Sequence, residues 1–353
     1  MTNHKRSEAL IRDNIVPVIT PKTKAGHIDV DAVAKLVQLH AKSLGTKALF
    51  AVGGLGRFHE LSDEDRIRAA TAWISANKKL GSPLRLFLGA TAESSEATLE
   101  NMRKYLELGA DVVFFSPLYF LRPDDVAAFI EKAREEVLGP NMPLLIYNNP
   151  AFSRQEEKNI DPETLRGCSS CISAIKDSSM DHELYCKFAS IEDVALYTGN
   201  ESALIDAVRR QGSHGSVGGL GNVTGTAAKL ARQLVALGDD EDDDPIIAKL
   251  AAKFNKENAA LHRVLKKHPD IDAGDFMSAI YHFCLGEAGV VEPQEELVEM
   301  LTEEDRKFLR KEGFIPDQPM IKKEQKSSQK RDNEAGGDSF VENKKIRGDA
   351  AAQ

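Results

Sequence analysis

The chain reads Leu144-Leu145-Ile146-Tyr147-Asn148-Asn149-Pro150 at one point and Ile172-Ser173-Ala174-Ile175-Lys176-Asp177 at the next apolar run. Each segment runs from an apolar strand to a polar tip, where the strand ends. A lysine at the tip of a buried strand has its amine held in one place, and loss of water lowers the pKa of an amine. Lys176 is therefore a candidate nucleophile, and Tyr147 on a neighbouring strand suits carbonyl chemistry.

The same plan recurs along the chain and predicts a fold class. Amphipathic helical segments separate the apolar runs, and Ser62 and Ser94 stand where helices are expected to begin. Eight strands alternating with helices over about 240 residues are typical of a (β/α)8 TIM barrel, with a doubly wound open sheet as the alternative. The predicted strands are Ile15–Thr20, Ala48–Val52, Leu84–Gly89, Val112–Ser116, Leu144–Tyr147, Ile172–Lys176, Val194–Thr198 and Gly215–Val217.

The domain organisation follows from a change of pattern after Gly238. The six acids at 239–244 predict an exposed acidic loop. Helical periodicity without strand signals then predicts a C-terminal helical extension, and a polar stretch with almost no apolar residues predicts a disordered tail. The expected parts are an N-terminal arm at 1–13, the barrel at 14–238, the acidic loop, the helical extension at 245–313 and the tail at 314–353.

Composition excludes several classes of function. The net charge of −9 over 353 residues provides no basic field for nucleic acid. No run of 18 apolar residues is present to span a membrane. The first residues lack the apolar stretch of a signal peptide, and the four cysteines suggest reduced thiols. A cytoplasmic location is expected.

Unusual residues follow the strands, where active sites of parallel barrels lie. The second strand leads into Gly53-Gly54-Leu55-Gly56-Arg57, whose glycines let backbone N–H groups approach a ligand. Further candidates follow the later strands: Tyr119, Phe152, Ser178, Asn200, Val217 and Gly219.

Four motifs in barrel-compatible order resemble one known family. They are Val16-Pro17-Val18-Ile19-Thr20-Pro21, the glycine loop before Leu61-Ser62, the Tyr147-Asn148-x-Pro150 turn and Ile175-Lys176-Asp177. From Asn14 to Gly313 the chain resembles the dihydrodipicolinate synthase/N-acetylneuraminate lyase superfamily. The resemblance implies that Lys176 forms a Schiff base with a 2-oxo acid such as pyruvate. It also implies that Tyr147 shuttles the proton and that the glycine loop holds the substrate carboxylate through backbone amides.

The chain departs from the family pattern at three places. The family loop reads Gly-Thr-Thr-Gly-Glu, so both hydroxyls are lost here and the acid is replaced by Arg57. The slot of an arginine that binds the second substrate in the synthase branch holds Phe152. The paired tyrosines after the fourth strand are reduced to Leu118-Tyr119. Arg57 fits either a substrate carboxylate or a structural ion pair, and Phe152 fits either packing or recognition. These departures argue against dihydrodipicolinate synthase itself.

The sequence predicts a class I Schiff-base lyase with Lys176 and Tyr147 as catalytic residues. The favoured reaction is pyruvate-dependent aldol cleavage or condensation of a 2-keto-3-deoxy-type acid, so the partners are a 2-oxo acid and an aldehyde. A keto-deoxy sugar acid dehydratase using the same lysine and a non-catalytic 2-oxo-acid-binding protein are the alternatives. The resemblance implies a homo-oligomer, a tetramer or dimer, and no cofactor is expected.

One cysteine pattern superficially suits zinc. Cys168, Cys171, His182 and Cys186 have a spacing found in zinc sites. The strand that carries Lys176 separates the two pairs by some 15 Å by strand geometry, so no metal site is predicted.

Overall fold

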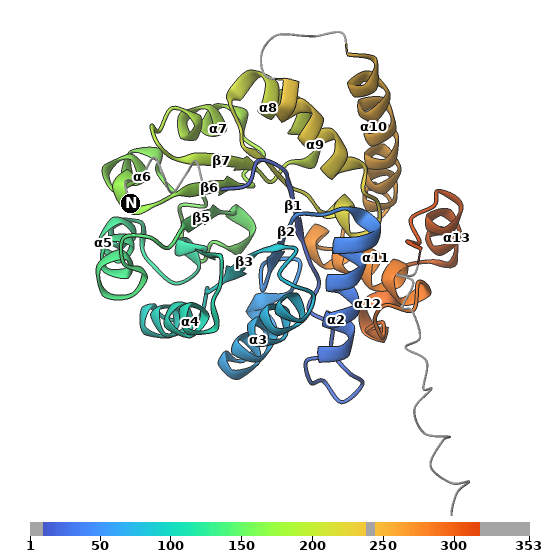
Figure 1. Cartoon of the computed structure of the whole chain (residues 1–353), viewed down its shortest axis with the longest axis horizontal. Helices are drawn as coiled ribbons and strands as arrows, with labels where there is room; N and C mark the ends of the chain where they lie inside the picture. Colours follow the sequence, from blue (N-terminus) through green and yellow to red (C-terminus); the bar gives the residue numbers. More distant parts are fainter. Residues whose placement is uncertain (1–9, 238–243, 318–353) are drawn as a thin grey trace, which may run out of the picture. The chain divides into compact units, whose positions relative to one another are not determined.

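Eight parallel strands pair in sequence order around a closed barrel, and helices on the outside connect them (Figure 1). This computed structural model describes residues 10–237 and 244–317. The predicted (β/α)8 barrel is therefore confirmed. Its strands are β1 (Asn14–Pro17), β2 (Ala48–Ala51), β3 (Arg85–Gly89), β4 (Val112–Phe115), β5 (Leu144–Asn148), β6 (Ala174–Asp177), β7 (Ala195–Thr198) and β8 (Gly215–Val217).

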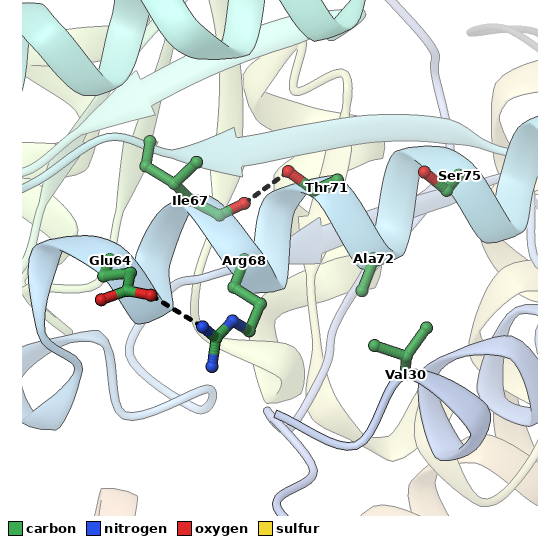
Figure 2. Close-up of a pocket in the computed structure, with 7 residues that line it drawn as sticks. All are labelled: Val30, Glu64, Ile67, Arg68, Thr71, Ala72 and Ser75. Carbon is green, nitrogen blue, oxygen red and sulfur yellow. Dashed lines mark hydrogen bonds and ion pairs between the residues drawn. The ribbon is translucent and has the colours of Figure 1, made fainter. Parts of the chain in front are cut away.

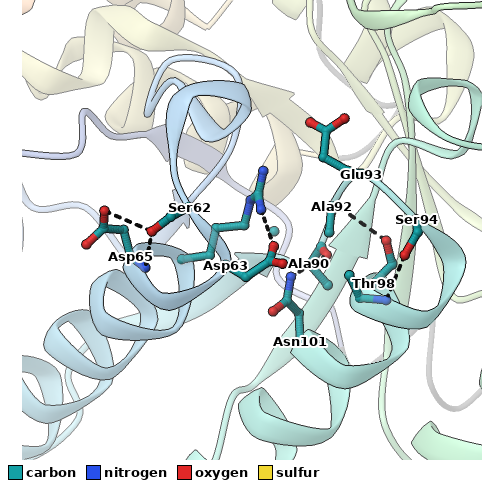
Figure 3. Close-up of polar contacts among 12 residues, drawn as sticks. Ser62, Asp63, Asp65, Ala90, Ala92, Glu93, Ser94, Thr98 and Asn101 are labelled. Atoms are coloured by element: carbon teal, nitrogen blue, oxygen red, sulfur yellow. Dashed lines mark hydrogen bonds and ion pairs between the residues drawn. The ribbon is translucent and has the colours of Figure 1, made fainter.

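The outer helices alternate with these strands along the chain. They are α2 (Val30–Gln38), α3 (Asp63–Lys79), α4 (Ser95–Leu108), α5 (Val126–Ala133), α6 (Pro162–Gly167), α7 (His182–Ala189), α8 (Leu204–Gln211) and α9 (Thr226–Leu237). As predicted, Ser62 and Ser94 cap α3 and α4, where their hydroxyls accept hydrogen bonds from the Asp65 and Ala97 amides (Figure 3).

Side chains that alternate along the strands fill the barrel interior. Its lower part is closed by Leu10 and by Tyr197, whose hydroxyl donates to the Ile11 carbonyl at 2.6 Å. Residues 10–13, expected as part of an arm, thus contribute to the packed structure; residues 1–9 lie outside the described residues. The upper part holds the rings of Phe50, Phe114 and Tyr147. A packed interior forces any reacting side chain to the mouth of the barrel.

The chain continues into four helices: α10 (Pro245–Lys266), α11 (Ala273–Glu287), α12 (Glu295–Val298) and α13 (Glu303–Lys311). Helix α10 packs along α9, and α11 contacts both α12 and α13. Tyr281 of α11 packs against Gly219, just beyond β8. The helical extension therefore supports the strand ends, and it belongs to the same compact unit as the barrel.

Two of the predicted segments, the acidic loop and the tail, lie largely outside the described residues. Most of the acidic loop, 239–243, lies outside them, whereas Asp244 caps α10 by accepting from the Ile246 amide at 2.6 Å. The predicted tail from 318 onward also lies outside. Phe314, which the prediction assigned to the tail, is only 1% exposed. The packed chain therefore extends beyond Gly313, because this ring is buried.

An open groove of about 510 Å³ lies between α2 and α3 (Figure 2). Its sides include Val30 at the start of α2 and Ile67 and Thr71 of α3. Its lining residues belong to the two helices and not to the strands or strand-end loops. The groove therefore shares no residue with the region around Lys176.

No helix among residues 10–237 and 244–317 is both long and apolar enough to cross a bilayer.

Candidate active site

Lys176 points into the mouth of the barrel from β6. Its side chain is 5% exposed, and its amine lies 3.8 Å from the ring centroid of Tyr147 and 4.5 Å from that of Phe50. Burial lowers the pKa of this amine, while the neighbouring Tyr147 and Asp177 partly oppose the shift. A larger share of the amine is therefore neutral, as a nucleophile requires.

Tyr147 lies beside Lys176 because the two are register partners in the parallel pair β5–β6. The tyrosine is 6% exposed. Its oxygen accepts a hydrogen bond of 2.7 Å from the Asn149 side-chain amide. Asn149 is the variable position of the Tyr-Asn-x-Pro turn, and sequence reasoning missed it because that turn specifies no residue there. The Asn149 amide thus lies beside the Tyr147 hydroxyl. Unlike a hydroxyl, a side-chain amide does not relay protons.

Two stacked phenylalanines form the floor beneath these residues. The rings of Phe50 and Phe114 lie 3.6 Å apart by centroid at an angle of 17°. Tyr147 meets the Phe50 ring edge-on at 5.7 Å. This apolar floor removes water from below the amine of Lys176, which is the cause of its pKa shift.

The last side chains of β5 and β6, Asn148 and Asp177, bind each other and hold the two strand ends together. The Asn148 side-chain amide donates to the Asp177 carboxylate at 2.7 Å, and the Ser178 amide donates to the Asn148 carbonyl at 2.9 Å. Burial raises the pKa of Asp177. The Ser178 hydroxyl lies against Gly199, beside the end of β7. Lys176 and Tyr147 are therefore positioned by a hydrogen-bonded pair behind them.

The glycine loop after β2 presents backbone amides at the barrel mouth. Within the described residues, the Gly54 and Leu55 amides donate no hydrogen bond to the protein, and both residues are partly exposed. The turn closes through a 2.8 Å bond from the Arg57 amide to the Gly54 carbonyl. Val52 adopts φ 56°, a strained conformation for a β-branched residue. Free amides in a tight turn can bind a carboxylate.

Arg57 is directed away from these amides and into ion pairs. Its Nε donates to Glu60 at 2.7 Å, and its guanidinium also pairs with Asp275 of α11. The side chain is 19% exposed. Of the two roles left open by the sequence, this geometry is that of a structural ion pair joining the loop to α11.

Phe152, Tyr119, Phe58 and His59 form what we call the aromatic wall. Phe152 lies 5.0 Å from Phe58 and 5.5 Å from His59, and Phe58 lies 5.1 Å from Tyr119, by ring centroid. The short helix η6 (Pro150–Phe152) places Phe152 there. The wall stands beside the glycine loop.

The polar end of Tyr119 is held by a charged pair. The hydroxyl donates to Glu93 at 2.6 Å, and the Arg154 guanidinium stacks 3.8 Å from the ring centroid. Burial and Glu93 raise the pKa of Tyr119 to about 12. Sequence reasoning missed Glu93 and Arg154, because the strand-end loops that carry them are distant in sequence.

The remaining predicted residues lie at the ends of β7 and β8. The Asn200 side chain accepts from the Ser202 amide at 3.1 Å and so acts as a cap. Val217 faces the barrel interior at 3% exposure. Gly219 faces the Tyr281 hydroxyl. Asn200 and Gly219 therefore have local structural partners.

Glu201 is a residue of this region that the sequence offers only as a loop-end candidate, because Asn and Glu are common in turns. Its carboxylate accepts from the Leu220 amide at 3.0 Å, and burial raises its pKa to about 7. The sequence pattern of a turn-end glutamate does not reveal this burial, which depends on the loop after β8.

Strand β6 separates the two halves of the cysteine and histidine pattern along the chain. Cys168 and Cys171 precede β6, whereas His182 and Cys186 lie on α7 after it. Among the described residues, no three potential metal-ligating side chains form a group.

Gly54 and Phe152 are expected to be coupled in stability. A Cβ atom at Gly54 would lie 2.6 Å from the Phe152 ring. We expect Gly54→Ala to reduce the free energy of unfolding by about 1–3 kcal/mol through overpacking. In a Phe152→Ala background the loss should fall by about 1 kcal/mol or more. Urea denaturation measures both. Gly167→Ala is the control, because a Cβ there meets nothing within 4 Å; equal losses at Gly54 in both backgrounds would contradict the contact.

Glu201→Gln is expected to change how stability depends on pH. The pKa of about 7 lies above the ordinary 4.5, so the folded state binds this proton more tightly. The resulting stability is fully present below about pH 4.5 and is lost as pH rises through 7. At pH 8 the variant should be more stable than the native protein by about 2 kcal/mol, with a smaller gain at pH 5. Urea denaturation at both values tests this, with the exposed Asp206→Asn as control; equal gains at both values would argue against it.

Comparison with known proteins identifies the family of this chain. The model of the dihydrodipicolinate synthetase family matches residues 11–271. A 4-hydroxy-tetrahydrodipicolinate synthase of Laribacter hongkongensis (strain HLHK9) is 26% identical over 230 residues, covering 64% of this chain and 77% of the relative.

Solved structures share the fold. A sialic acid aldolase catalytic lysine mutant of Ruminococcus gnavus has a TM-score of 0.69 at 18% identity, covering 89% of this chain and 97% of its own. A 2-keto 3-deoxygluconate aldolase from Picrophilus torridus has a TM-score of 0.61 at 22% identity, with coverages of 76% and 92%. The predicted superfamily resemblance is confirmed. The family match spans most of the chain, and the chain therefore belongs to the dihydrodipicolinate synthetase family.

Proposed function

We propose that this protein is a class I Schiff-base lyase that acts on a 2-oxo acid. The observation that carries the proposal is the buried Lys176 amine, set against the Tyr147 ring at the barrel mouth. Its lowered pKa favours attack on a ketone. The family supports lyase chemistry, and pyruvate is the 2-oxo acid that the motif resemblance suggests.

The first step joins Lys176 to the substrate. The neutral amine attacks the ketone carbon, and loss of water leaves a protonated imine. The free Gly54 and Leu55 amides are the proposed partners of the adjacent carboxylate. Binding at the carboxylate would orient the ketone towards the lysine.

Tyr147 is proposed to move the protons. The imine draws electrons from the neighbouring carbon, which loses a proton and becomes an enamine. Because the Tyr147 oxygen already accepts from Asn149, its own O–H remains available to donate. Having donated this proton to the departing water, the Tyr147 oxygen takes up the proton that the carbon beside the imine loses. No loop hydroxyl contributes to this relay, since positions 54 and 55 are glycine and leucine.

The favoured reaction is aldol cleavage or condensation. In condensation the enamine carbon attacks an aldehyde carbon, and the aldehyde oxygen takes up a proton. Water then hydrolyses the imine, which releases a 4-hydroxy-2-oxo acid and free Lys176. Such a product is of the 2-keto-3-deoxy type. The P. torridus aldolase, named for a 2-keto 3-deoxy acid, supports this choice.

The alternatives differ in the step after imine formation. A dehydratase would use the same lysine to expel a hydroxyl group, but the glycine loop lacks the hydroxyl and acidic side chains of that branch. A non-catalytic binding protein would form no covalent adduct.

The four free cysteines fit a reducing compartment such as the cytoplasm, and we infer a homo-oligomer from the family.

Borohydride trapping with pyruvate tests the proposed function. We expect a stable adduct, seen as a mass increase on the peptide that contains Lys176. The adduct should be lost in Lys176→Ala and still form, more slowly, in Tyr147→Phe. Lys187→Ala, on the exposed side of α7, is the matched control. No adduct with any of a panel of 2-oxo acids would remove the Schiff-base proposal.

Arg57→Ala separates a structural role from substrate binding. Because Arg57 is paired with Glu60 and Asp275, we expect the KM for the 2-oxo acid to change less than about threefold. The melting temperature should fall by a few degrees, as about 1 kcal/mol predicts for a chain of this size. Steady-state kinetics and thermal melting provide the two values. A tenfold rise in KM without loss of stability would instead assign Arg57 to the substrate carboxylate.

A further inference from the structure

A small cavity lies beside the glycine loop, where the loop meets α11. Its volume is about 10 Å³, which is at the lower limit for one water molecule. Three separate parts of the chain line it: Thr20 after β1, Leu55 and Gly56 of the glycine loop, and Ser278 and His282 of α11. A molecule bound in this cavity would therefore touch both the loop and the C-terminal helices.

Four polar groups on these lining residues have no partner within the described residues. Thr20, Ser278 and His282 are at most 5% exposed, but the two hydroxyls and Nδ1 of the imidazole form no hydrogen bond there. The amide of the buried Gly56 also donates no hydrogen bond to the described residues. Buried polar groups nearly always have a hydrogen-bond partner. A small polar molecule in the cavity would supply one.

The glycine loop packs directly on Thr20. A Cβ built on Gly56 would lie 2.8 Å from the Thr20 hydroxyl oxygen and 3.1 Å from the Val18 carbonyl oxygen. The absence of a side chain at position 56 therefore lets the loop backbone approach the hydroxyl closely. The ion pair between Arg57 and Asp275 joins the next residue of the loop to α11. The loop is thus held between the end of β1 and this helix.

The charges around the cavity favour a neutral molecule. Burial, together with Arg57 and Lys22, lowers the pKa of His282 to about 4, so its ring is neutral near pH 7. These two cations disfavour a bound metal cation. The Arg57 guanidinium is already paired with Glu60 and Asp275, so it provides little attraction for an anion. Water can both donate and accept hydrogen bonds, so it fits hydroxyls, an amide and either tautomer of the ring.

We propose that this cavity binds one water molecule, through which Ser278 and His282 of α11 position the glycine loop. The water would also bind Thr20 and the Gly56 amide, which gives it the two to four partners that are usual for a buried water. Because Gly56 directly follows Leu55, holding one peptide in place orients the other. The positioning role rests on the proposed Schiff-base function, in which the Leu55 amide binds the carboxylate of the 2-oxo acid.

Crystallography of the native protein tests the bound water without any substrate. We expect one density peak within about 2.7–3.2 Å of the Thr20 and Ser278 hydroxyl oxygens and of Nδ1 of His282. Crystals grown with bromide or rubidium salts distinguish water from an ion, because these ions scatter anomalously and water does not. No peak at this position, or an anomalous peak there, would overturn the water assignment.

Removal of the hydroxyls tests the positioning role. Borohydride trapping over a range of pyruvate concentrations yields the half-saturating concentration and the maximal rate separately. We expect Thr20→Val and Ser278→Ala each to raise the half-saturating concentration about threefold or more, while the maximal rate changes less than about twofold. Thr20→Ser, which keeps the hydroxyl, should retain the native value. Ser75→Ala, at an exposed position of α3, is the matched control.

The double variant Thr20→Val/Ser278→Ala tests whether the two residues share one water. Since either single change already weakens the hold on that water, the double variant should raise the half-saturating concentration by less than the product of the single effects. An effect equal to that product would argue for two independent contacts and against the shared water.

The trapping data and the density peak distinguish this inference from the proposed function. A normal adduct with an unchanged half-saturating concentration in both single variants would overturn the positioning role and leave the Schiff-base function intact. Failure to trap any 2-oxo acid on Lys176 would overturn that function and the positioning role with it. The density peak decides the bound water in either case.

Discussion

The removal of water from the Lys176 amine is the constraint on which the site depends. The amine rests against Tyr147 and above the stacked Phe50 and Phe114 rings, at the point where a closed barrel runs out of interior. The parallel register of β5 and β6 places lysine and tyrosine side by side, and the Asn148–Asp177 bond holds that register from behind. The barrel fold and the aromatic floor together exclude water from the Lys176 amine, and this burial lowers its pKa.

The departures of the glycine loop from the family pattern are physically linked. Position 54 lacks a hydroxyl, and the Phe152 ring fills the space beside it. Arg57 replaces an acid and is drawn to Asp275, so α11 supports the loop from outside the barrel. The C-terminal helices therefore stabilise the mouth of the site as well as the fold. The loop carries no hydroxyl at positions 54 and 55, and the Tyr147 oxygen accepts its hydrogen bond from the Asn149 amide.

Much of the fold was predictable because its signals are local. The apolar run at Val112–Ser116 corresponds to β4, and the helix expected from Pro245 is α10. Lys176 and Tyr147 could be selected because each ends such a run. Asn149, Glu93 and Glu201 could not, since their importance arises from partners that no local pattern specifies. The burial that raises the pKa of Glu201 to about 7 is produced by the loop after β8, which the sequence around the β7 end does not include.

The sequence by itself determined the alternation of strands and helices, the superfamily resemblance and the lysine at a strand tip, because periodicity and strand ends are properties of short segments. Only the tertiary structure decided which residues meet: Arg57 with Asp275, Asn149 with the Tyr147 oxygen, and Phe152 with Gly54. These contacts bring together side chains and loops at the barrel mouth. Their distances depend on closure of the whole sheet, and no local pattern specifies that closure.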